Sequence, residues 1–310
     1  MRDGKPSNRL TAPAGLAAVF FAALLIALAG CGSSEASRPA DASDLKLKIG
    51  YVGWGEDLAV AQLTKVLLEE RLDHGEVELR RVGIREAYQD VASKKLDAFQ
   101  SVRMPNQSAE FERVADRTAL FNSWIVGTTR ASLAVPAYMD VRNPEKLDTA
   151  VAQVLTIRPD ASPVGKIPSA ALSDYGLRAE REYPDAPAML DEVAQLYEEK
   201  KPFVFVAWTP HWLNEEYDIN YLEDPKGSLS DITRPGSLHM LVRKDLVDKD
   251  PTAHALMDAI VMTETEATNL QVSIREAKNP ENGVHVWIDD NKKLVKDWVK
   301  SARERAADGS

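Results

Sequence analysis

The sequence predicts an α/β protein built on parallel β-sheets. The first observation is an alternation of strand and helix patterns near the start of the predicted domain. It comprises a strand at 45–52, an amphipathic helix at 56–71, a strand at 77–82, a helix at 85–94 and a strand at 96–99. The second observation is the continuous apolar run Phe203–Trp208 between Pro202 and Pro210, which is typical of a buried strand. Strands joined through helices at this spacing are the mark of βαβ units.

Trp208 stands at the end of that buried strand, where a loop follows. Ligands of open α/β sheets bind beyond the carboxyl ends of the strands, and an indole face there attracts a cation. The competing interpretation is that Trp208 and Trp212 are core aromatics that close the strand, since most Trp side chains are largely buried. The pattern alone leaves both open.

The remaining elements follow from periodicity and from Pro and Gly breaks. Strands are expected at 131–136, 151–157, 218–222 and 237–242, and helices at 111–115, 144–147, 167–175, 186–199, 252–262, 263–278 and 292–306. Residues 101–106 are expected to form a loop, because Met104-Pro105 stops the preceding strand. Residues 279–283, Asn-Pro-Glu-Asn-Gly, are expected to form a turn.

Composition and charge exclude several functions. The chain has 310 residues, 44% hydrophobic and 28% charged, as in a globular protein of one large or two ordinary domains. The formal charge is −10; the first thirty residues carry +2, so the rest carries −12. An acidic body argues against nucleic acid as a partner and against broad adsorption to anionic lipid.

The N-terminus has the layout of a secretory signal. A basic segment with Arg2, Lys5 and Arg9 precedes an apolar stretch at 16–28. Leu28-Ala29-Gly30-Cys31 then resembles a bacterial lipobox, which implies cleavage before Cys31 and its acylation. An ordinary signal peptide or a membrane anchor is the alternative. We expect residues 1–30 to be the signal and the Gly/Ser/Ala-rich segment 31–44 to be a flexible tether on the lipidated Cys31.

Catalysis is not indicated. The best candidates for an enzyme are His211 with Glu215 or Asp218, but no Gly-x-Ser-x-Gly elbow or phosphate loop accompanies them. The five His residues show no metal-ligand spacing, and Cys31 is the only Cys. We therefore expect no enzymatic activity, no cofactor and no metal site.

Five segments together resemble one family, the substrate-binding proteins of glycine betaine/choline (OpuAC-like) ABC importers. They are similar, in order, to its first strand and Trp, its D-x-x-x-x-x-W-x-P segment, and its "W…AVPxYM", "GWxPHW" and "FLEDPKG" segments. In this chain they are 48–54, 96–105, 124–139, 207–212 and 221–227, and the resemblance covers about residues 46–300.

This resemblance implies a two-lobed type II periplasmic-binding-protein fold with the ligand in the cleft between lobes. Residues 45–133 and 238–305 would form lobe 1, and 134–237 lobe 2. It also implies a monomer held at the extracytoplasmic face of the cell membrane through Cys31. Its partners would be a quaternary-ammonium or zwitterionic osmolyte and an ABC permease with its ATPase. A sensor that binds ligand without transport fits equally well.

The family encloses a trimethylammonium group in an aromatic box, and Trp54 and Trp208 fall on two box positions. The family commonly has Trp where this chain has Arg103. A guanidinium about 4 Å from a ligand cation would cost roughly 4 kcal/mol at an effective dielectric of about 20. Either Arg103 points out of the cleft, or Glu56 or Asp57 neutralises it, or the ligand is another carboxylate-bearing solute.

Three further residues are candidate ligand contacts. Asp57 could face a ligand cation, although acids in a first helical turn usually complement the helix dipole. Ser162 lies on the loop whose backbone N–H groups, in the family, face the ligand carboxylate; Pro163 removes one such donor. Trp124 is either a contact or a packing aromatic inside one lobe.

Overall fold

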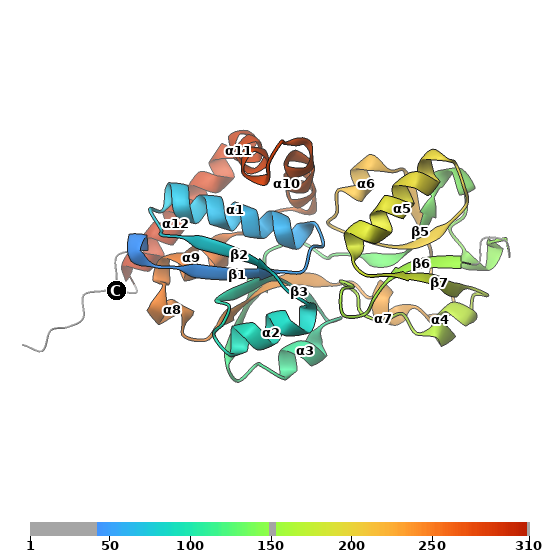
Figure 1. The fold of residues 1–310 in the computed structure, drawn as a ribbon, viewed down its shortest axis with the longest axis horizontal. Helices are drawn as coiled ribbons and strands as arrows, with labels where there is room; N and C mark the ends of the chain where they lie inside the picture. The colour runs from blue at the N-terminus through green and yellow to red at the C-terminus, as the bar shows by residue number, and fades with distance from the viewer. Residues whose placement is uncertain (1–41, 149–152, 309–310) are drawn as a thin grey trace, which may run out of the picture. The chain divides into compact units, whose positions relative to one another are not determined.

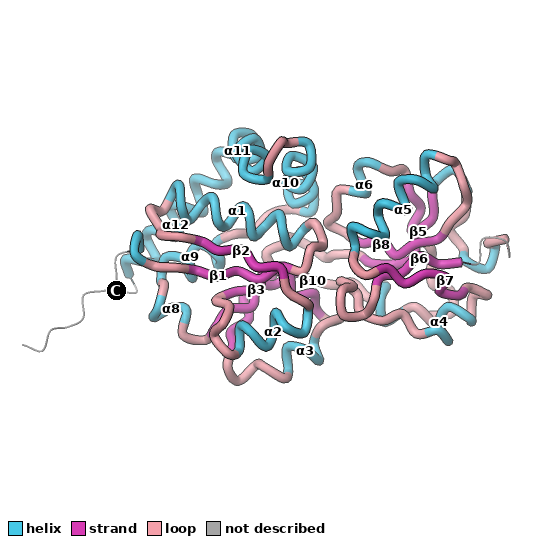
Figure 2. Tube along the Cα trace, in the orientation of Figure 1, coloured by secondary structure: helices cyan, strands magenta, loops and turns pink. Residues whose placement is uncertain are grey.

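The computed structural model describes residues 42–148 and 153–308. The predicted signal peptide and Cys31 lie outside this range, and of the predicted tether only residues 42–44 fall within it, as the short 3-10 helix η1. Two five-stranded sheets organise the described chain, with helices on both faces of each (Figure 1; Figure 2). None of the described helices is both long and apolar enough to cross a bilayer.

The first sheet has the strand order β2-β1-β3-β10-β4. Its strands are β1 (Leu47–Tyr51), β2 (Val77–Arg81), β3 (Ala98–Met104), β4 (Thr118–Ser123) and β10 (Ser237–Arg243). β1 pairs in parallel with β2 and β3, as the βαβ spacing predicted, whereas β10 runs antiparallel between β3 and β4. Its helices are α1 (Glu56–Arg71), α2 (Ile84–Ala92), α3 (Ser108–Glu112), α8 (Leu246–Lys249), α9 (Pro251–Ala259), α10 (Glu264–Glu276), α11 (Pro280–Asp290) and α12 (Lys292–Asp308).

The second sheet has the order β7-β6-β8-β5-β9. Its strands are β5 (Ala131–Pro136), β6 (Gln153–Ile157), β7 (Arg178–Tyr183), β8 (Val204–Trp208) and β9 (Ile219–Tyr221). Its helices are α4 (Ser169–Ser173), α5 (Ala186–Glu198), α6 (Leu213–Glu216) and α7 (Ser230–Thr233), with 3-10 turns η2 (Ala137–Met139) and η3 (Pro144–Lys146). All five residues of β8 are buried, which agrees with the buried strand predicted from its apolar run.

At two places where sequence reasoning failed, the structure shows the reason. β3 continues to Met104 although residues 101–106 were predicted as a loop, because Ser101 and Arg103 are polar yet fully buried where β3 pairs with β10. Residues 280–290 form helix α11 although 279–283 was predicted as a turn. Asn279 caps that helix by accepting the backbone N–H of Asn282, and Pro280 occupies its first turn. Two strands, β4 and β7, were not predicted at all.

The chain passes between the sheets after β4 and again before β10. β5 begins at Ala131 and pairs with β8 and β9 of the second sheet. The lobe boundaries proposed at 133/134 and 237/238 stay a prediction. We call the first sheet with its helices the first layer, and the second sheet with its helices the second layer. A single cluster of buried apolar residues includes Trp54, Tyr88 and Phe99 from the first layer and Phe205 and Trp208 from the second. The two layers therefore meet in a packed core at the point where β1 and β8 end.

Candidate functional site

The connection from β1 to α1 is held by one carboxylate. Asp57, fully buried, accepts the backbone N–H groups of Gly53 at 3.1 Å, Trp54 at 2.8 Å and Leu58 at 2.8 Å, and also that of Val52. Burial raises the pKa of Asp57, and these backbone donors act in the opposite direction. Asp57 thus fixes the loop that carries Trp54, and its ligand contact stays a prediction.

Trp54 joins the two layers. Its Nε1–H donates to the carbonyl oxygen of Ala161 at 2.7 Å, on the loop that follows β6, and only 1% of the residue is exposed. Its ring meets that of Phe99 edge to face, with the ring centres 6.3 Å apart. The loop after β1 and the loop after β6 therefore contact one another through a single indole.

Glu56 lies at the centre of the site. One carboxylate oxygen accepts from Arg103 Nη2 at 3.3 Å, and the other accepts from Trp208 Nε1 at 3.1 Å. Arg103 also donates to Thr129 Oγ1 at 2.8 Å and to the Thr209 carbonyl at 3.2 Å. We call Trp54, Glu56, Arg103 and Trp208 the Trp–ion cluster. Its members come from both layers and are each at most 1% exposed.

The Trp–ion cluster contains two ionisable side chains, Glu56 and Arg103, that are almost completely excluded from solvent. Burial raises the pKa of Glu56 to about 7, although Arg103 pulls it downward. Burial likewise lowers the pKa of Arg103, against the attraction of Glu56. The Nε–H of Arg103 is buried and has no hydrogen-bond partner among the described residues. An acceptor such as a ligand carboxylate would satisfy that N–H.

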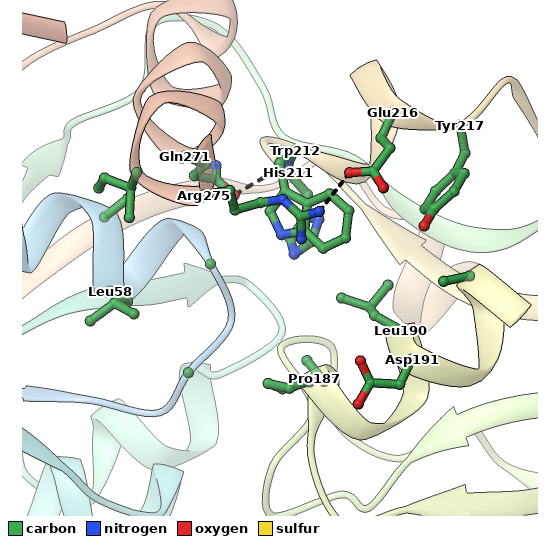
Figure 3. Close-up of a pocket in the computed structure, with 16 residues that line it drawn as sticks. Leu58, Pro187, Leu190, Asp191, His211, Trp212, Glu216, Tyr217, Gln271 and Arg275 are labelled. Carbon is green, nitrogen blue, oxygen red and sulfur yellow. Dashed lines mark hydrogen bonds and ion pairs between the residues drawn. The ribbon is translucent and has the colours of Figure 1, made fainter. Parts of the chain in front are cut away.

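A cavity of about 340 Å³ opens beside the Trp–ion cluster, between α1, α5 and α10 (Figure 3). Its lining includes His211, Trp212 and Arg275. The Arg275 guanidinium lies 3.2 Å from the centre of the Trp212 ring and donates to Glu216 at 2.6 Å. The neighbouring ring of His211 contacts Trp208 edge to face, with centres 4.7 Å apart.

The remaining predicted site residues, Ser162 and Trp124, lie in different parts of the structure. Ser162 is buried beside Ala161, so its loop adjoins Trp54; its hydroxyl accepts the backbone N–H of Val164 at 3.4 Å. Trp124 packs in the separate core of the first sheet and donates to the Gln100 carbonyl at 2.8 Å. Ligand contacts by Ser162 and Trp124 stay predictions.

Sequence reasoning did not place Glu56 among the site residues. It named Glu56 only as one possible neutraliser of Arg103, and the structure contains that ion pair. It missed Thr129 and Thr209 entirely, because both reach Arg103 from segments far away in sequence. In residues 42–148 and 153–308 no group of three or more His, Cys, Asp or Glu side chains is placed to hold a metal ion.

Comparison with known proteins identifies the class. Residues 46–290 match the family model described as the substrate binding domain of an ABC-type glycine betaine transport system. The chain therefore belongs to that family, and its fold is the expected two-sheet α/β fold of type II periplasmic binding proteins.

Similar individual proteins agree with this membership. The glycine betaine/carnitine transport binding protein of Listeria monocytogenes is 26% identical over 42% of this chain; the match spans only 43% of that protein. The solved structure of lactococcal OpuAC, complexed with glycine betaine, is 25% identical with a TM-score of 0.70, and covers 83% of this chain and 100% of that one. A glycine betaine/L-proline-binding protein from Borrelia burgdorferi is 23% identical with a TM-score of 0.72, covers 84% and 99% of the two chains, and shows the shared fold.

Proposed function

We propose that this protein is an extracytoplasmic solute receptor that captures a glycine betaine-type osmolyte and delivers it to an ABC permease. The family membership supports the receptor role. The single observation that carries the ligand class is the Trp–ion cluster, in which Trp208 donates to the buried Glu56, Glu56 pairs with the buried Arg103, and Trp54 lies two residues before Glu56.

A zwitterion has chemistry that suits this cluster. A trimethylammonium group has no hydrogen-bond donor, so indole faces and a nearby carboxylate are the groups that can bind it. Trp54, Trp208 and Glu56 supply these. A carboxylate is a strong acceptor for a guanidinium, and Arg103 offers it the unpartnered Nε–H.

The ion pair also changes how Arg103 acts on a bound cation. Its charge is offset by Glu56 at 3.3 Å, so a ligand cation near the cluster meets a pair rather than an isolated positive charge. Of the three explanations for Arg103 in place of Trp, neutralisation by Glu56 is the one with a contact in the structure. A different carboxylate-bearing solute remains the second candidate ligand.

We further propose that Cys31 carries a lipid and that the mature protein is a monomer at the outer face of the cell membrane. The lipobox-like segment and the single Cys support this. We propose no catalysis: the His211 ring accepts the backbone N–H of Leu213 at 3.2 Å, and within the part of the chain that the structure describes it forms no hydrogen bond or ion pair with Glu215 or Asp218. A sensor that transports nothing would share all these features.

The decisive experiment is calorimetry of the mature protein against glycine betaine, proline betaine, carnitine, choline and ectoine. Betaines with a carboxylate are expected to bind more tightly than choline, which brings a cation and no partner for Arg103. If no compound of this set binds, the proposed ligand class is wrong although the family membership stands. Deletion of the gene for this protein separates transport from sensing, because uptake of the bound betaine is lost only if the protein delivers its ligand.

A further inference from the structure

The cavity beside the Trp–ion cluster has apolar walls and one polar end, which His211 forms. Leu58 of α1 and Leu190 of α5 lie on opposite sides of it (Figure 3). Ala194 of α5 and Ile274 of α10 extend the apolar lining. Its volume of about 340 Å³ lies at the lower end of the range of small-molecule sites. Neither Trp54 nor Trp208 lines it, so it is a compartment distinct from the Trp–ion cluster.

His211 presents an unused hydrogen-bond donor at this cavity. The residue is only 1% exposed, and its Nδ1 accepts the Leu213 backbone N–H, so Nδ1 carries no proton. Burial lowers the pKa of His211 to about 3, which keeps the ring neutral with its proton on Nε2. No described residue accepts a hydrogen bond from Nε2. His211 Nε2 is not among the fully buried side-chain atoms that lack a hydrogen-bond partner, so its N–H is accessible from the cavity and can bond to an acceptor there.

The cavity disfavours ionic ligands. Arg275 is already paired with Glu216, and Asp191 has no ion-pair partner among the described residues. The charged side chains of the lining thus leave an excess of one negative charge, which repels an anion. Asp191 is exposed to solvent, which screens its attraction for a cation, and a cation would have to leave water for apolar walls and the N–H donor of His211. An uncharged ligand meets neither penalty.

We infer that this cavity is a second binding site for an uncharged small molecule with an apolar body and one hydrogen-bond acceptor, which bonds to His211 Nε2–H. This site goes beyond the proposed betaine site. The apolar body lies between Leu58 and Leu190. Because α1 and α10 belong to the first layer and α5 to the second, the occupant contacts both layers at once.

The test uses acetophenone as the probe on the mature protein, with ethylbenzene as its near-isosteric partner without an acceptor and benzoate as its anionic counterpart. Calorimetry is expected to give a Kd of about 1 mM or below for acetophenone, as nine or so heavy atoms allow. Ethylbenzene and benzoate are expected to bind at least about tenfold more weakly. The ¹⁵N resonance of His211 Nε2 should shift with acetophenone and not with ethylbenzene.

Variants locate the site. His211→Asn keeps an acceptor near the position of Nδ1 and removes the Nε2 donor, so it should weaken acetophenone at least about tenfold. His211→Gln, which can place an N–H near Nε2, is the matched control and should retain binding within about threefold. Ala194→Phe fills the cavity from a half-buried position of α5 and should abolish binding. It also keeps the test valid if the His211 variants do not fold.

Three results would overturn the inference: no acetophenone binding at millimolar concentration, equal binding of acetophenone and ethylbenzene, or unchanged binding in folded Ala194→Phe. Glycine betaine affinity, measured on the same samples, separates this site from the proposed one. Loss of acetophenone with betaine binding intact supports two sites.

Discussion

The guanidinium of Arg103 and the carboxylate of Glu56 form an ion pair at 3.3 Å in which the side chains are 1% and 0% exposed. Arg103 comes from β3 and Glu56 from the start of α1, and Glu56 is in turn bonded to Trp208 of the other layer. Neither charge could be buried alone at a tolerable cost. The pair therefore links the charge balance of the site to the packing of its tryptophans.

Arg103→Met is expected to destabilise the protein by about 3–5 kcal/mol, because it leaves Glu56 buried without a counter-charge. Adding Glu56→Gln removes the orphaned charge, so the double variant should regain most of that loss. Urea denaturation measures both. The matched control is Lys46→Met, which breaks an exposed pair with Glu76 and should cost less than about 1 kcal/mol. Equal costs for the two single variants would contradict a buried, coupled pair.

The pH dependence of stability should contain two opposing contributions. The pKa of Glu56 is raised from 4.5 to about 7, so between these values the folded state retains a proton that the unfolded state has released. That contribution is present in full below pH 4.5 and is lost as the pH rises through about 7. The pKa of His211 is lowered from 6.5 to about 3. The contribution of His211 to stability is therefore present in full above pH 6.5 and is lost as the pH falls from 6.5 to about 3.

Glu56→Gln separates the two. It removes the proton uptake by Glu56, so its stability should rise more steeply with pH than that of the wild type between about pH 5 and 7. The difference in free energy of unfolding accumulated over the window should be of the order of a few kcal/mol. Urea denaturation at half-unit pH steps gives it. Parallel curves for the two proteins would show that Glu56 does not titrate in this range.

Trp208→Ala and Trp54→Ala should each weaken glycine betaine binding by about 1–3 kcal/mol, from lost cation–π contact and apolar burial. Trp208→Phe keeps a π face and removes the donor to Glu56, so it should lose less. Trp124→Phe is the informative comparison, because Trp124 packs in the core of the first sheet. Calorimetry on variants with native-like circular dichroism measures these effects. Wild-type affinity in both Ala variants would place the ligand elsewhere.

Choline should bind more weakly than glycine betaine, and Arg103→Trp should narrow that gap by removing the positive charge and adding a π face. Because Arg103→Trp leaves Glu56 buried without a counter-charge, it is best made together with Glu56→Gln. Calorimetry with both ligands on wild type and double variant gives the comparison. Tighter choline than glycine betaine binding in the wild type would refute a carboxylate-directing role for Arg103.

Cys31→Ser should release the protein from membranes or leave an unprocessed precursor, because the acylated thiol is the proposed anchor. Cell fractionation with immunoblotting of the two forms follows both outcomes. Normal processing with unchanged membrane retention in the variant would show that the anchor lies elsewhere.

Local pattern was sufficient for the elements whose environment is uniform along the segment. The run Phe203–Trp208 is apolar throughout, which is typical of a buried strand, and the acidic first turn at Glu56 correctly marked the start of α1. Pattern failed where burial and polarity disagree. Ser101 and Arg103 are polar residues inside a strand, and Asn279-Pro280 begins a helix with residues that also form turns.

The sequence by itself determined the α/β class and the family, together with the strand ends that carry Trp54 and Trp208. Only the tertiary structure decided what Arg103 does. Its partners Glu56, Thr129 and Thr209 lie 47, 26 and 106 residues away in the chain, and no local signal marks them as neighbours. A buried charge is tolerated only where hydrogen-bond acceptors converge on it, and convergence from distant segments is a property of the folded chain.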